Sequence, residues 1–144
     1  MATSQPTVPP RLLEKLLSGI ALAYGLTITT GFWISIAPHQ SMWPFPGLYF
    51  IEVVFLPALL AFSVFRGSPQ RARIASLSAG CVSVFTILGA MSVGLAYIPL
   101  VLLALVMAAV GRLVTRETLA QCAAFFVGSA ALQALGMLFL VSVA

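Results

Sequence analysis

Long apolar runs separated by short polar connections make up most of this chain. The runs predict transmembrane helices over residues 16–36, 48–65, 74–91, 95–111 and 119–143. An α-helix rises 1.5 Å per residue, so about 20 apolar residues cross the roughly 30 Å hydrocarbon core of a bilayer. We therefore expect an all-α integral membrane protein, a bundle of about five transmembrane helices in a single domain over residues 11–144. A flexible, Pro-rich tail at residues 1–10 is expected to precede it.

Residues 74–111 are the ambiguous part of this pattern, because no charged side chain within them marks a connection. One straight helix of that length is about twice as long as a single crossing requires, whereas two short helices fit. Gly94 and Pro99 interrupt the run, so we place the break between residues 92 and 99. One kinked helix over this segment, and with it a four-helix bundle, is the alternative.

The basic residues fall into three clusters, at residues 11–15, 66–73 and 112–116. With five helices, all three clusters lie on one side of the membrane and the opposite connections carry none. Cytoplasmic loops are enriched in Lys and Arg, so we expect a cytoplasmic N-terminus, an outside C-terminus and a multi-pass location in the cell inner (plasma) membrane. The third cluster also favours five helices over four, because four would leave it outside.

The composition supports membrane insertion and excludes other classes. Hydrophobic residues make up 61% of the chain and charged residues 7%, whereas soluble domains carry about 25% charged residues. The net charge of +4 comes from basic residues in connections rather than from a basic stripe with exposed aromatic residues. We therefore expect no nucleic-acid partner. Cys81 and Cys122 form no CxxC motif, which argues against a zinc or dithiol site.

Glu52 is the one ionisable residue inside a predicted span, about one turn below its outer end. A carboxylate at that depth is a candidate proton carrier, cation site or hydrogen-bond acceptor. His39 lies in the connection on the same side, so it is able to meet Glu52, and Trp43 and Tyr49 would complete an outer-face pocket for a quinol, pigment or small amphiphile. The plainer alternative is an exposed loop histidine and a carboxylate that reaches the interface.

The remaining polar residues indicate no enzyme and no metal site. We find no metalloprotease, nucleotide-binding or nucleophile-elbow motif, so we expect no enzymatic activity. One histidine cannot supply both axial ligands of a b-type haem. We predict no cofactor, and a pigment or quinone at the outer face stays open. Gln133, in the last apolar run, is costly to leave unpaired in lipid and is expected to bond another helix.

Small residues recur at four-residue spacing in the third run, at Ala72, Ser76 and Gly80, and Ala90 and Gly94 continue the pattern. Such stripes let helices approach closely, either inside the bundle or against another subunit. With the lipid bilayer, we expect other membrane subunits or copies of this chain as partners.

The absence of a catalytic motif and the small extramembrane mass favour one function class. We expect an accessory or assembly subunit of a larger membrane complex, respiratory or photosynthetic. The alternative is a homo-oligomeric transporter or channel that uses Glu52.

Overall fold

The computed structural model of the protein describes residues 10–39, 41, 47–89 and 93–143. It contains the α-helices α1 (Pro10–Ile36), α2 (Gly47–Phe65), α3 (Arg71–Leu88), α4 (Ile98–Thr115) and α5 (Leu119–Val143), and the one-turn 3-10 helix η1 (Gly94–Tyr97). Within these residues there is no strand, and five helices are long and apolar enough to span a membrane. The prediction of an all-α, five-helix protein is therefore confirmed, and residues 74–111 form two helices rather than one.

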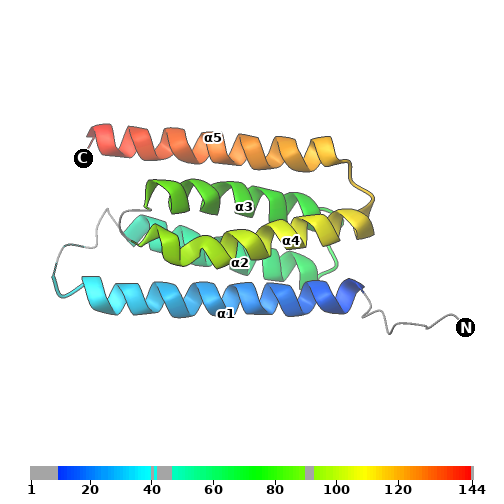
Figure 1. The fold of residues 1–144 in the computed structure, drawn as a ribbon, viewed down its shortest axis with the longest axis horizontal. Helices are drawn as coiled ribbons and strands as arrows, with labels where there is room; N and C mark the ends of the chain where they lie inside the picture. Colours follow the sequence, from blue (N-terminus) through cyan, green and yellow to red (C-terminus); the bar gives the residue numbers. More distant parts are fainter. Residues whose placement is uncertain (1–9, 40, 42–46, 90–92, 144) are drawn as a thin grey trace, which may run out of the picture.

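The five helices run roughly along one axis, with α1 and α5 on opposite sides and α2, α3 and α4 between them (Figure 1). α3 packs against α2, α4 and α5, whereas α1 packs against α2 and α4. α5 packs against α3 and, over a short stretch, against α4. The helix order brings all seven Lys and Arg residues to the end of the bundle where α1, α3 and α5 begin. We call it the basic end.

Several helix boundaries differ from those expected. α1 begins at Pro10, six residues before the predicted span, and α4 continues to Thr115 beyond its apolar run. Hydropathy does not detect these extensions, because the helical backbone hydrogen bonds continue where side chains become polar. Pro99 was expected to mark the break but lies in the first turn of α4, where its missing N–H costs no hydrogen bond. The predicted tail lies outside the described residues except for Pro10, which belongs to α1.

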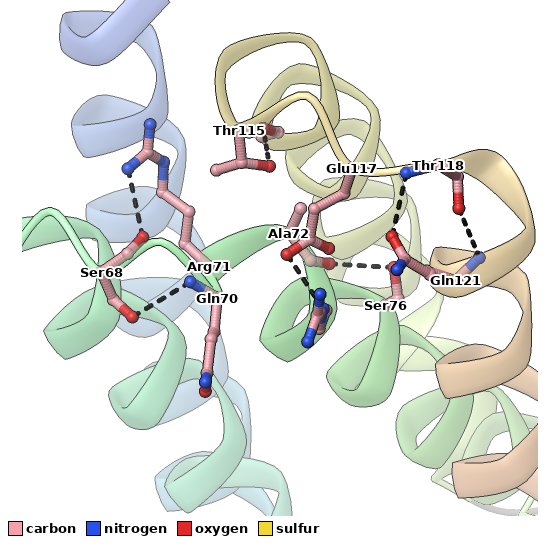
Figure 2. A network of polar contacts seen from close by, with 11 residues as sticks. Ser68, Gln70, Arg71, Ala72, Ser76, Thr115, Glu117, Thr118 and Gln121 are labelled. Carbon is pink, nitrogen blue, oxygen red and sulfur yellow. Dashed lines mark hydrogen bonds and ion pairs between the residues drawn. The ribbon is translucent and has the colours of Figure 1, made fainter.

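Capping hydrogen bonds form in both connections at the basic end, at the end of α2 and at the start of α5. After α2, Gly67 has a φ of 66°, and its N–H donates to the carbonyl of Val64 while that of Ser68 donates to the carbonyl of Ser63. This is a Schellman ending, which favours glycine at the left-handed position. At the start of α5, the Thr118 N–H donates to Gln121 Oε1 and the Gln121 N–H donates to Thr118 Oγ1 (Figure 2). This reciprocal capping box fixes where α5 begins.

The small residues of α3 lie in contacts within the chain. A side-chain carbon at Gly80 would overlap Ser129 Oγ and the carbonyl oxygen of Phe126 on α5. Ala72 is fully buried, and a Cβ built at Gly111 of α4 would lie 3.3 Å from its Cβ. Close approach of α3 to both neighbours therefore depends on these positions. This face of α3 is occupied by α4 and α5 and is not open to another subunit.

The other predicted packing residues lie nearby. Ser76 is buried and donates to the Ala72 carbonyl of its own helix, at 2.9 Å. Gly94 lies in η1, where its N–H donates to the Gly89 carbonyl at 2.7 Å and a Cβ would collide with Gly89. This contact lets the chain reverse tightly between α3 and α4. Ala90 lies outside the described residues.

Aromatic side chains fill the core at the end opposite the basic end. Tyr97 is fully buried, with its ring centroid 5.1 Å from that of Phe85 and 6.2 Å from that of Phe32. Tyr49 packs on Phe85, with 5.7 Å between their centroids. This cluster supports the start of α2, where Glu52 lies.

Candidate functional site

The candidate site is a polar contact between α2 and α5, formed by Glu52 and Gln133. The Gln133 side chain donates from Nε2 to Glu52 Oε2 at 2.6 Å. Both side chains are partly buried, and the backbones of α2 and α5 do not otherwise pack against each other. The expectation that Gln133 bonds another helix is thus confirmed. A hydrogen bond of this kind is charge-assisted when the carboxylate is ionised, and it is then stronger than one between neutral groups.

A cavity of about 350 Å³ lies beside this pair, open to the surface of the bundle between α2 and α5. Its wall is apolar apart from Glu52, Gln133 and the Tyr49 side chain. Glu52 Oε1 makes no hydrogen bond within the described residues, so one carboxylate oxygen stays available next to the cavity. The arrangement is able to accept a hydrogen bond or a proton from a small amphiphile entering from lipid.

The predicted outer-face pocket is only partly assembled. Tyr49 and Glu52 line the same cavity. His39 lies in the turn after α1 and is exposed, and no hydrogen bond or ion pair joins it to Glu52 in the described part of the chain. Trp43 lies outside the described residues. The site that the structure builds is therefore Glu52 with Gln133, not Glu52 with His39.

Sequence reasoning missed the most buried charged pair. Glu14 lies in the charged segment before the first predicted span, but it is only 2% exposed. Its Oε1 accepts a hydrogen bond from Arg71 Nε of α3 at 3.0 Å. Glu14 lies on the buried face of α1, at helical spacing from Ser18, Ala21, Gly25 and Thr29. Extending this small and polar stripe back by one turn would have identified Glu14.

A second ion pair joins α3 to the connection before α5. Arg73 Nε lies 3.0 Å from Glu117 Oε1, and the Arg73 guanidinium lies over the Phe125 ring at 5.8 Å from its centroid. Glu117 reaches from the connection over α3 (Figure 2). Both ion pairs therefore lie at the basic end, and Glu52 is the carboxylate at the other end.

The described residues contain no group of three or more His, Cys, Asp or Glu side chains placed to hold a metal ion. Cys81 and Cys122 are both free thiols. The chemistry that the site offers is hydrogen bonding and proton exchange at one carboxylate. Comparisons with protein-family models, with curated proteins and with solved structures find no match to this chain, so the fold and the site are interpreted from their own geometry.

Proposed function

We propose that this protein is a small accessory or assembly subunit of a larger membrane complex, in which α5 contacts a transmembrane helix of another protein. The observation that carries the proposal is the outward face of α5. Its inward face is buried against α3 through Cys122, Ser129 and Met137. Its outward face carries small residues that no neighbouring helix covers.

Gly128 lies on that face, and Gly136 lies at its margin, next to the buried Met137. Both are exposed, and a Cβ built at either meets no atom within 4 Å. They lie eight residues apart, close to two helical turns, and Ala124 extends the same face by another turn. Exposed small residues at this spacing let the backbone of a second helix approach closely, which is the main route to helix association in lipid.

Hollows beside these glycines would receive side chains of the partner helix. Gly128 lines a cavity of about 340 Å³ between α3 and α5, and Gly136 lines the cavity that contains Glu52 and Gln133. The second cavity offers a hydrogen-bond acceptor at Glu52. The preferred occupant is therefore a transmembrane helix that carries a small-residue face and a hydroxyl or amide side chain near the level of Glu52.

The test is the size and composition of the particle extracted from native membranes in mild detergent. We would compare the unaltered chain with the Gly128→Leu/Gly136→Leu variant. The matched control is Gly19→Leu/Gly31→Leu on α1, because these glycines are also exposed and a Cβ at either also meets no atom within 4 Å. All three chains should fold, since a Cβ at each of the four positions meets no atom of the bundle within 4 Å.

The proposal expects the unaltered chain and the α1 variant to migrate in a large particle of constant composition, and the α5 variant to migrate alone. Equal assembly of the two variants would contradict the role of α5. A lone monodisperse species from native membranes would overturn the subunit proposal. A particle that contains only copies of this chain would favour the second candidate function, a homo-oligomeric transporter or channel.

The second candidate is a homo-oligomeric transporter or channel with Glu52 as its coupling residue. The observation in its favour is the carboxylate oxygen of Glu52 beside a cavity that opens at the surface of the bundle. One chain offers few polar groups for an aqueous path, so several copies would have to combine. Glu52→Gln should then abolish proton-coupled flux in vesicles, whereas Glu117→Gln at the basic end should preserve it. Unchanged flux in Glu52→Gln would exclude this candidate.

A further inference from the structure

The basic end contains a third cavity, of about 240 Å³, between the start of α1 and the connection from α2 to α3. Four cationic side chains line it, Arg11 and Lys15 from α1, Arg66 from the end of α2 and Arg71 from the start of α3. Glu14 is its one acidic residue. The Schellman turn between α2 and α3 brings Arg66, which follows α2, and Arg71, the first residue of α3, to the same hollow.

The charge in this cavity is only partly neutralised by the protein. Arg71 is paired with Glu14, and its Nη1 donates to the Ser68 carbonyl at 3.2 Å (Figure 2). The side chains of Arg11, Lys15 and Arg66 form no hydrogen bond and no ion pair within the described residues. Three cations therefore face one hollow whose single carboxylate, Glu14, is already paired with Arg71.

Exposed aromatic rings of α2 adjoin this hollow. The Arg66 guanidinium lies over the Phe62 ring, 4.8 Å from its centroid, and Lys15 Nζ lies 6.0 Å from the centroid of Phe65. Both rings are more than half exposed. The chain thus presents a cationic hollow at a helix end, directly next to an apolar surface. This arrangement suits a molecule with an anionic head and a long apolar tail, because the head would lie in the cationic hollow and the tail against the apolar surface.

We propose that this cavity binds the phosphate group of an anionic phospholipid, with its acyl chains lying against the exposed rings of α2. Arginine forms paired hydrogen bonds to phosphate oxygens, and lysine adds a point charge. Basic pockets between membrane helices bind anionic headgroups by the same chemistry. The binding requires only that the basic end lies at the level of the headgroups, whichever leaflet that is. It is independent of a partner protein at α5.

The test is native mass spectrometry of the full chain in detergent, titrated with phosphatidylglycerol or with phosphatidylcholine of the same acyl chains. Phosphatidylglycerol is expected to bind more tightly, because its headgroup carries a net negative charge. Arg11→Gln/Arg66→Gln removes two cations of the cavity and is expected to weaken that binding by about 25-fold, roughly fivefold for each charge. Both side chains are exposed, so the fold should persist, and circular dichroism checks it.

The matched control is Arg112→Gln/Arg116→Gln, which removes two arginines from the same end of the bundle outside this cavity. It should leave the preference for phosphatidylglycerol nearly unchanged. Equal weakening in the two variants, or equal binding of the two lipids, would overturn the proposal. Inorganic phosphate and glycerol 3-phosphate form a further arm. If either displaces phosphatidylglycerol at similar concentrations, the cavity binds soluble phosphate and the lipid assignment is wrong.

Discussion

α1 and α5 are the two outer helices of the bundle, and they are held in different ways. Each lies on one side of the α2–α4 group (Figure 1). α1 contacts two helices and η1, whereas α5 rests mainly on one helix, α3. The apolar window of each helix is equally little buried, at 17%. Their difference therefore lies in the kind and placement of the contacts rather than in the buried fraction.

Polar contacts join α1 to the rest of the bundle at residues 14, 24 and 29. The Glu14–Arg71 pair fastens its start, the Tyr24 hydroxyl donates to the Ala96 carbonyl at 2.8 Å, and the Thr29 and Tyr97 hydroxyls lie 3.1 Å apart. α5 is fastened near its middle. There Ser129 Oγ donates to the Leu77 carbonyl of α3 at 3.0 Å and Gln133 donates to Glu52. Since the hydrogen bonds of α5 to other helices all lie near its middle, we expect it to be the helix that a partner adjusts most easily.

The largest expected effect comes from breaking the buried ion pair of α1. Arg71→Met leaves the Glu14 carboxylate buried without its cation, which should lower the free energy of unfolding by about 3–5 kcal/mol. Unfolding by added SDS, followed by circular dichroism, measures this loss. The double variant Glu14→Leu/Arg71→Met should recover most of it, because no charge is then left unpaired. A single variant as stable as the unaltered chain would show that the pair is not an anchor.

The next effect separates α5 from α3 without touching α1. Gly80→Val places a branched side chain where Ser129 and the Phe126 backbone lie, at an expected cost of about 2 kcal/mol. Cys122 is buried on α5, so its alkylation rate in a Cys81→Ser background should rise roughly 30-fold, which corresponds to that cost. Gly128→Val is the control, because its side chain enters open space. Slow alkylation in Gly80→Val would mean that α5 is held elsewhere.

Helix number and spacing were predictable from the sequence, because lipid-facing helices are apolar on nearly every face and their runs stand out. Residues such as Leu132 and Phe139, more than 60% exposed in the bundle, belong to such runs. The ends of helices were less predictable. Pro10 to Lys15 form a helical turn that hydropathy assigns to water, because backbone hydrogen bonding does not depend on side-chain polarity.

The residues of the candidate site were predictable from the sequence, but the contact between them was not. Glu52 and Gln133 were identified separately, since a polar side chain in an apolar run requires a partner. The two residues are 81 positions apart in the chain. Their pairing depends on how α2 and α5 are placed around α3. For the same reason the sequence suggested His39 as the partner of Glu52, and it missed Arg71 as the partner of Glu14. Closeness along the chain was a poor guide where tertiary packing decides.

A smaller effect is expected from the polar contact of α5. Gln133→Leu removes the hydrogen bond to Glu52 and should destabilise the α5 position by about 1 kcal/mol, the usual range for such bonds between membrane helices. Cys122 alkylation should then rise about fivefold. Glu52→Gln retains an amide partner for Gln133 and should have less effect on the same rate. If both variants alkylate equally fast, the charge of Glu52 contributes to holding α5.

The smallest effect is expected within α1, where anchors are redundant. Thr29→Val removes the contact with the Tyr97 hydroxyl but keeps the volume of the side chain, so the expected loss of unfolding free energy is about 0.6 kcal/mol. Tyr97→Phe should cost a similar amount, and the double variant no more than either one, because both changes remove the same bond. SDS unfolding measures all three variants. Since the Glu14 and Tyr24 contacts, both on the N-terminal side of Thr29, still hold α1, Cys122 alkylation should stay at its original rate. A rise in that rate would mean that α1 and α5 are coupled through the core, and the contrast between an anchored and an adjustable outer helix would no longer hold.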